Sequence, residues 1–315
     1  MALIKRRYGA HLSDAAKETL AQSRPYPSSY AIKNPLTRRL VRRICDADWG
    51  ATLSQIDFDY AIEEKTIADV PCLSFRTPQT SADNPLILYL HAGAFVCGSA
   101  RSNAGAVIPS CHLSGCEALA VDFSLAPESV FPTQLDEIGA VYRALIESGR
   151  DPSKIVLFGD SAGGTLAAAS LFRWRRIGLP APGALVLLSP ALDAATNSDT
   201  YETLRGRDPL FSSAGRDSVI DCFRLYAGAA DASDPEISPI EGDPGGFPPT
   251  LIHVGTREVL LGDAARFAEK ARRAGVDVSL RVFDGMFHLF HQHWRLDDAR
   301  AAHRDIAEFI VRTAR

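Results

Sequence analysis

Short runs of apolar residues recur along the chain, and from about residue 86 they alternate with stretches in which apolar positions follow a helical period. Apolar runs of four to six residues are typical of strands buried on both faces of a parallel sheet. Such runs occupy residues 86–90, 118–121, 155–158, 185–188, 251–254 and 278–283, and helical patterns occupy 134–148, 162–176, 263–274 and 298–313. Alternating strands and helices predict a doubly wound α/β fold with a mostly parallel sheet.

The sheet is expected to begin with antiparallel strands. Ile56–Tyr60 alternates between apolar and polar residues with a period of two, and Cys72–Phe75 follows a turn at Val70-Pro71. Both patterns are typical of half-buried strands that precede the parallel part of a sheet.

A basic helix is predicted before these strands. Asn34 and Pro35 fit the N-cap and the first turn of a helix. Its apolar stripe, which is formed by Leu36, Leu40, Val41 and Ile44, is expected to pack against the main domain. Residues 1–50 contain ten Lys and Arg against four Asp and Glu, so contact with a membrane surface or an acidic partner is the alternative.

Residues 195–247 interrupt the alternation, because they are rich in Asp, Ser, Gly and Pro around one helical stretch near 218–226. An insertion of about fifty residues is long for a connection in a compact domain and favours a cap with its own role. We therefore expect an N-terminal cap segment over 1–53, a cap insertion over 195–247, and a catalytic domain over 54–194 and 248–315.

The composition excludes several protein classes. Hydrophobic residues at 46% and charged residues at 23% are typical of a packed soluble protein, and the net charge of −4 provides no general attraction to nucleic acid. No apolar stretch approaches the roughly 20 residues of a membrane span, and no apolar segment of a secretory signal follows the basic N-terminus. The six cysteines lack zinc-type spacing, so we expect buried, reduced thiols in a cytoplasmic protein without a metal. The sequence does not decide whether the protein forms a homodimer.

The strand predicted at 155–158 leads directly into Gly159-Asp160-Ser161-Ala162-Gly163, and a helical pattern begins at once. The pattern G-x-S-x-G between a strand and a helix is a nucleophile elbow, in which small residues let a serine occupy a strained turn above the sheet. Ser161 is therefore the predicted nucleophile.

A serine hydroxyl needs a base that accepts its proton and a third group that orients the base. His288 follows the last predicted strand, on a loop expected to end above the sheet, and is the predicted base. His291 and His293 are the alternatives. His253 lies inside a strand and is expected to be a core histidine, whereas His303 is expected on a solvated helix face.

The acid is expected after the strand that ends at Gly255. Glu258 follows three residues later, whereas Asp263 fits better as the cap of the next helix. We favour Glu258 and keep Asp263 as the alternative. The resulting order of serine, acid and histidine agrees with the predicted fold.

Residues 91–95 (His-Ala-Gly-Ala-Phe) follow the strand predicted at 86–90. Acyl transfer requires hydrogen-bond donors for the oxyanion of the tetrahedral intermediate. The main-chain N–H groups of Gly93, Ala94 and Ala162 are the predicted donors.

Six segments occur in the order and with the gaps of a known enzyme family. They are residues 91–95, 122–128, 159–163, Ser189-Pro190 with Asp193, 258–261 and 287–288. From about residue 54 to its end, the chain resembles the hormone-sensitive-lipase-like (family IV) esterases of the α/β-hydrolase superfamily. The resemblance implies an esterase for small acyl esters that needs no metal or cofactor and carries a helical cap.

The chain departs from the family pattern at two places. HGGG is usual where this chain has HAGA, so Ala92 and Ala94 are expected to adopt conformations that glycine normally supplies, at a cost on the order of 1 kcal/mol. Glu258-Val259-Leu260 stands where Asp-Pro-Leu is usual.

Substrate preference is open at this stage. Phe95, Cys97 and Phe211 are expected to line the pocket, because they follow the oxyanion loop or lie in the cap. A lactonase or N-deacetylase would use the same triad. A non-catalytic small-molecule receptor is the alternative from another class, and the presence of His288 argues against it.

Overall fold

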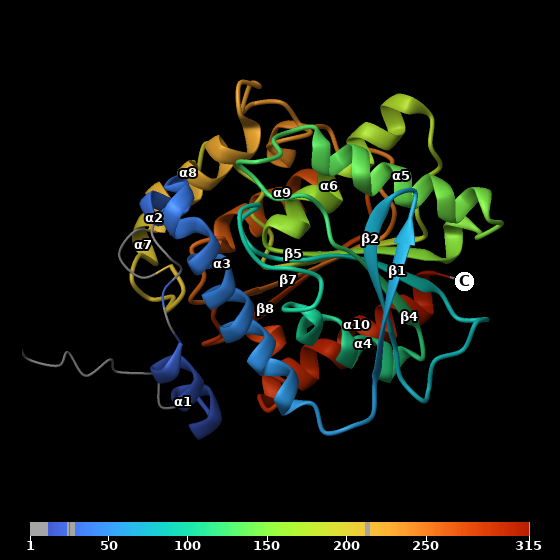
Figure 1. The fold of residues 1–315 in the computed structure, drawn as a ribbon, viewed down its shortest axis with the longest axis horizontal. Helices are drawn as coiled ribbons and strands as arrows, with labels where there is room; N and C mark the ends of the chain where they lie inside the picture. Colours follow the sequence, from blue (N-terminus) through green and yellow to red (C-terminus); the bar gives the residue numbers. More distant parts are fainter. Residues whose placement is uncertain (1–11, 24, 26–28, 212–214, 315) are drawn as a thin grey trace, which may run out of the picture.

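The computed structural model describes residues 12–23, 25, 29–211 and 215–314. Its centre is an eight-stranded sheet in the order β1-β2-β4-β3-β5-β6-β7-β8 (Figure 1). The strands are β1 (Ala61–Ile67), β2 (Val70–Arg76), β3 (Leu86–Leu90), β4 (Glu117–Val121), β5 (Ile155–Asp160), β6 (Ala184–Leu188), β7 (Thr250–Gly255) and β8 (Val278–Phe283). β2 pairs antiparallel with both β1 and β4, and all other pairs are parallel. This arrangement confirms the predicted fold class.

Helices cover both faces of the sheet. The α-helices are α1 (Asp14–Gln22), α2 (Ser29–Lys33), α3 (Pro35–Gly50), α4 (Ile108–Ser114), α5 (Thr133–Glu147), α6 (Ala162–Ile177), α7 (Thr200–Thr203), α8 (Gly215–Ala227), α9 (Leu261–Arg273) and α10 (Asp297–Thr313). Short 3-10 helices are η1 (Ala51–Gln55), η2 (Ala104–Ala106), η3 (Pro152–Lys154), η4 (Pro239–Glu241) and η5 (Phe290–Gln292). Helices α5, α6 and α9 lie on one face and α4 and α10 on the other, while α2, α3, α7 and α8 lie together at one side (Figure 1).

The inner strands β3, β5, β6 and β7 are buried at every position because helices cover both of their faces. Successive residues of a strand point to opposite faces. In β3, Leu86, Leu88 and Leu90 join the core beneath α5, α6 and α9, whereas Ile87 and Tyr89 join the core beneath α4 and α10. The parallel strands and the helices α5, α6, α9 and α10 lie within two residues of their predicted positions.

The predicted strand at Ile56–Tyr60 is wrong. This segment is a loop after η1, and the first strand begins at Ala61. Ile56, Phe58 and Tyr60 pack from this loop against the core beneath α4 and α10. A loop that lies along a core therefore produced the same alternation as a strand.

Helix α3 begins as predicted, with the Asn34 side chain accepting a hydrogen bond from the Leu36 amide at 2.9 Å. Its predicted packing face is wrong for three of the four apolar residues, whereas Val41 is buried as predicted. Leu36, Leu40 and Ile44 are 89%, 61% and 46% exposed. The buried positions are Val41 and Cys45, which are four residues apart and therefore lie on one side of the helix.

Two arginines explain which face of α3 packs inward. Arg42 donates to the main-chain oxygens of Val96 and Ala126 at 2.8 and 2.9 Å, and its guanidinium contacts Glu128 at 2.7 Å. Arg38 reaches the same carboxylate at 2.9 Å. Because these bonds fix the rotation of the helix, the Leu36 stripe faces outward.

Candidate active site

The loops after three parallel strands bring Ser161, Glu258 and His288 together at one edge of the sheet. Ser161 follows β5, Glu258 follows β7 and His288 follows β8. His288 Nε2 lies 2.9 Å from Ser161 Oγ, and His288 Nδ1 lies 3.0 Å from Glu258 Oε2. All three side chains are buried. Distances of this size allow the imidazole to exchange a proton with the hydroxyl while the carboxylate orients the ring.

The turn that holds Ser161 requires glycine on both sides. Ser161 has φ +53°, and α6 begins at the next residue. A Cβ at Gly159 would lie 2.2 Å from the main-chain oxygen of Gly163, and a Cβ at Gly163 would lie 2.0 Å from that of Leu90. The two glycines of G-x-S-x-G therefore allow the backbone to pass at close range while the serine is held in a strained conformation.

The Glu258 carboxylate is anchored through one of its oxygens. Oε1 accepts hydrogen bonds from Ser189 Oγ at 2.8 Å and from the Gly255 amide at 2.6 Å. Oε2 is thereby directed toward His288. Ser189 is itself buried, with φ +46°. The Ser189-Pro190 pair is one of the family segments in the sequence, but no sequence pattern predicts the hydrogen bond from the Ser189 hydroxyl to Glu258.

Asp263, the alternative acid, lies apart from the imidazole. It accepts hydrogen bonds from the amides of Leu192 and Asp193 at 3.1 and 3.2 Å and from the Tyr201 hydroxyl at 3.0 Å. Burial, together with the nearby Asp193, raises its pKa to about 7. The expectation that Asp263 caps α9 is wrong, since Leu260 is the N-cap and Asp263 lies in the first turn. Its observed contacts fix the segment after β6.

Of the other histidines, His253, His291 and His303 are buried, whereas His293 is half-buried. His291 is buried, and neither of its ring nitrogens has a hydrogen-bond partner in the described part of the chain. Burial lowers the pKa of His293 to about 4. His253 contacts Asp305 at 2.9 Å, as expected of a core histidine. The expectation for His303 is wrong, because it is buried and bonded to Ser110 Oγ at 2.8 Å.

The loop after β3 has unusual backbone angles. Gly93 has φ +135° and Ala94 has φ +54°, as does Phe95 with +66°. Ala92 has a negative φ, so the expectation that it replaces a glycine conformation is wrong. Within the described residues, the amides of Gly93, Ala94 and Ala162 have no acceptor.

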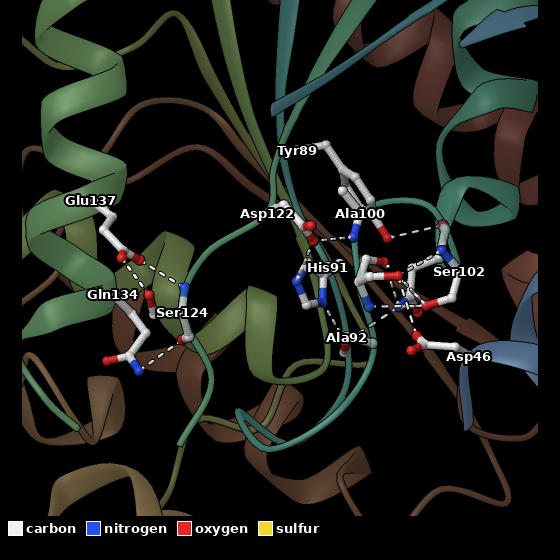
Figure 2. Close-up of polar contacts among 12 residues, drawn as sticks. Asp46, Tyr89, His91, Ala92, Ala100, Ser102, Asp122, Ser124, Gln134 and Glu137 are labelled. Carbon is white, nitrogen blue, oxygen red and sulfur yellow. Dashed lines mark hydrogen bonds and ion pairs between the residues drawn. The ribbon is translucent and has the colours of Figure 1, made fainter. Parts of the chain in front are cut away.

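A polar network supports this loop from behind (Figure 2). His91 Nδ1 contacts the Ala92 oxygen at 2.7 Å, and the His91 ring stacks on Phe123 with centroids 4.1 Å apart. Asp122 accepts a hydrogen bond from the Ala100 amide at 2.8 Å (Figure 2). Burial lowers the pKa of His91, so the ring is a neutral support of the loop.

The network continues at the end of β5, next to Ser161. The Tyr89 hydroxyl donates to Asp160 Oδ1 at 2.9 Å and to the main-chain oxygen of Asn103 at 3.2 Å. Asn103 in turn accepts from the Gln292 side chain at 2.8 Å. Burial raises the pKa of Asp160 to about 7. These bonds connect the loops after β3, β5 and β8.

The chain is similar in sequence to known hydrolases. A family model described as alpha/beta hydrolase fold matches residues 87–292. An acetyl-hydrolase of Streptomyces hygroscopicus is 32% identical over 290 residues, covering 87% of this chain and 96% of that protein. An esterase of Acinetobacter venetianus is 35% identical over 228 residues, covering 72% of this chain and 74% of that protein.

A solved structure extends the similarity to the whole fold. The crystal structure of an esterase from the bacterial hormone-sensitive lipase family superposes with a TM-score of 0.87 at 32% identity, covering 96% of this chain and 99% of that one. The chain belongs to the hormone-sensitive-lipase-like esterases of the α/β-hydrolase fold. As a member of this family it is a carboxylic ester hydrolase.

In this esterase the three predicted pocket residues lie in different surroundings. Phe211 lies beside the catalytic-site imidazole, with its ring centroid 4.8 Å from that of His288. Phe95 is buried and stacks on Tyr226 at 4.2 Å. Cys97 packs behind the oxyanion loop against α3, with Sγ 3.3 Å from the Gly93 oxygen.

The described part of the esterase contains no group of three or more His, Cys, Asp or Glu side chains that could hold a metal ion. Its six cysteines are free thiols, and five of them are buried. Among the described helices, none combines the length and the apolar character that crossing a bilayer requires.

Proposed function

We propose that this esterase is a serine carboxylesterase that hydrolyses small, short-chain acyl esters through an acyl-enzyme intermediate. The observation that carries the proposal is the unbroken line of contacts from Ser161 through His288 to Glu258, at 2.9 and 3.0 Å. Residues 1–53 and 195–247 are proposed to form the cap, which is supported by the contact of Phe211 with His288.

In the proposed mechanism, His288 Nε2 takes the proton of Ser161 as Oγ attacks the ester carbonyl carbon. Glu258 holds the Nδ1 proton and stabilises the imidazolium. The amides of Gly93, Ala94 and Ala162 donate to the oxyanion, an arrangement in which one donor typically contributes about 3 kcal/mol. The imidazolium protonates the leaving alcohol, and water then hydrolyses the acyl-enzyme by the same steps.

The preference for short acyl groups is supported by the aromatic residues next to the oxyanion loop. Phe95 stacks on Tyr226, and its ring lies 5.2 Å from that of Phe223. All three side chains are buried, and we infer that their packing beside this loop limits the length of the acyl group. We expect kcat/KM for p-nitrophenyl esters to be highest between acetate and butyrate and to fall toward decanoate. A maximum at decanoate would contradict this preference.

The nucleophile is tested by labelling with a fluorophosphonate. Ser161→Ala should abolish both the labelling and ester hydrolysis. Ser170→Ala is the matched control, because Ser170 is buried on the same helix α6 and should leave labelling unchanged. Undiminished labelling of Ser161→Ala would refute the assignment.

The acid is tested by comparing Glu258→Ala with Asp263→Ala. Loss of the group that orients the base lowers kcat by about 10⁴-fold in a comparable triad. We expect a loss approaching this size for Glu258→Ala. Asp263→Ala should act mainly on stability, since its contacts are with the segment after β6. A larger fall in kcat for folded Asp263→Ala would overturn the choice.

A further inference from the structure

Asp208 joins the proposed cap insertion to the main chain of the catalytic-site histidine. It lies between α7 and α8 and is fully buried. Its Oδ2 accepts a hydrogen bond from the His288 amide at 2.8 Å, and its Oδ1 accepts one from the Leu210 amide at 2.8 Å. The second bond closes a local turn of the Asx type. The first bond connects segments eighty residues apart.

Burying the Asp208 carboxylate costs free energy. Among the described residues, no Lys or Arg forms an ion pair with Asp208. Burial raises the pKa of Asp208 to about 6, and the charged groups that act on it are His288, which lowers it, and Glu258, which raises it. Burying a carboxylate without a cation costs free energy, which hydrogen bonds to the carboxylate offset only in part. Here those bonds end at the histidine of the site.

We propose that Asp208 is a positioning residue for His288. Its carboxylate accepts a hydrogen bond from the His288 main-chain amide, and Glu258 accepts one from the ring. Together the two bonds keep Nε2 directed at Ser161. The proposal rests on the proposed function, because it takes His288 to be the base.

The loop after β8 shows why a main-chain anchor matters. Leu289, which follows the histidine directly, has φ +60°, a conformation that a leucine rarely adopts. The bond from Glu258 to Nδ1 fixes the ring but not the backbone that carries it. Displacement of a catalytic group by about 1 Å can cost about a hundredfold in rate.

The test compares Asp208→Asn with Asp263→Asn. An amide has a single acceptor oxygen, so Asp208→Asn cannot serve both the His288 and Leu210 amides. We expect kcat for p-nitrophenyl acetate to fall by about ten- to a hundredfold with KM changed less than about threefold. Asp263→Asn removes an equally buried carboxylate that also accepts two main-chain amides, and it should retain kcat within about twofold.

A second variant separates the local turn from the contact with the histidine. Asp208→Ser keeps a side-chain oxygen for the turn to Leu210 but lacks the second oxygen that reaches the His288 amide. It should lose as much kcat as Asp208→Asn. Near wild-type kcat in a folded Asp208→Ser would overturn the proposal, even if Asp208→Asn fails to fold.

The pH profile distinguishes positioning from a general loss of structure. As the pH falls through about 6, Asp208 of the wild type takes up a proton and loses acceptor capacity. The ratio of wild-type to Asp208→Asn kcat should therefore shrink between pH 8 and pH 5. A ratio that stays constant with pH would overturn the proposal.

The two proposals fail in different ways. Hydrolysis by Ser161→Ala at the wild-type rate would refute the proposed function. An inactive Ser161→Ala beside an unaffected Asp208→Asn would refute only the role of Asp208.

Discussion

Ala94 occupies a left-handed backbone conformation in the loop that presents the proposed oxyanion donors, whereas Ala92 does not. The sequence pattern HAGA could not distinguish the two alanines, because each stands where a related sequence has glycine. The difference is set by the path of the loop around Gly93, whose missing Cβ would lie 1.7 Å from the main-chain oxygen of Cys97. The strain therefore falls on one alanine only.

We predict that glycine at these two positions has different effects on stability. For Ala94→Gly, relief of about 1 kcal/mol of strain offsets a similar loss of backbone entropy, so the free energy of unfolding should change by less than about 0.5 kcal/mol. Ala92→Gly should destabilise by about 1 kcal/mol, because no strain is relieved. Urea denaturation measures both. Equal destabilisation would contradict the assignment of strain, and kcat should survive because the donors are main-chain groups.

The predicted nucleophile, acid and base meet because each follows a strand of the parallel part of the sheet. Of these strands, β5 and β7 are buried throughout, whereas β8 is a partly exposed edge strand. Ser189 and Asp208 were not assigned roles for a physical reason. Their contacts depend on how the chain after β6 folds back over the sheet, and no periodic pattern records this. The sequence could therefore predict which residues lie at strand ends, but not which side chains bind one another. Ser189 also follows a strand, β6, yet no sequence pattern indicates its bond to Glu258.

At the scale of the element, α3 shows that an apolar stripe does not decide which face of a helix packs. The bonds from Arg38 and Arg42 to the Glu128 carboxylate compete with burial of Leu36, Leu40 and Ile44. The same helix packs Val41 and Cys45 against Val96 and Cys97, next to the oxyanion loop. Hydrogen bonding and the burial of Val41 and Cys45 therefore act together on the rotation of the helix.

We predict that Glu128→Gln weakens the docking of α3. Burial raises the pKa of Glu128, but hydrogen bonds from Arg42 and Arg38 outweigh it and lower that pKa to about 2. The stabilisation is thus present above the ordinary pKa of 4.5 and is lost as the pH falls toward 2. Because the carboxylate is half-exposed, the loss at pH 7 should be below about 1 kcal/mol and smaller in 1 M salt.

The control for this prediction is Glu64→Gln. Glu64 pairs with Arg101 at 3.2 Å on the surface, with both side chains largely exposed, and its removal should leave the unfolding temperature unchanged. Equal effects of the two substitutions in thermal unfolding at low salt would show that the Glu128 contacts contribute nothing specific to α3.

At the scale of the whole molecule, buried histidines make stability depend on pH. His253, His291 and His303 lie close together beneath the loop after β8, with the rings of His253 and His291 stacked 5.6 Å apart. Burial lowers the pKa of all three, most strongly for His291. The unfolded chain therefore binds more protons than the folded one below about pH 6.5, and stability falls as the pH drops through that range.

We predict that His291→Leu reduces this acid sensitivity. The substitution removes two ring nitrogens that are buried and lack partners in the described chain, and with them one group that must take up a proton on unfolding. The drop in unfolding temperature between pH 7.5 and pH 5 should be smaller than in the wild type. Phe290→Leu, the control, should lower the unfolding temperature equally at both pH values. A variant whose pH dependence matches the wild type would contradict this account.

The bond between Asp208 and the His288 amide has a consequence for protein engineering. The insertion that holds Asp208 also carries Phe211, which lies against the imidazole. Exchanging the segment 195–247 for one from a relative, in order to accept different esters, would remove the proposed support of His288 together with the Phe211 ring. A chimera that keeps an aspartate at the position of Asp208 is expected to retain turnover, and one that lacks it is expected to bind its new ester without hydrolysing it efficiently.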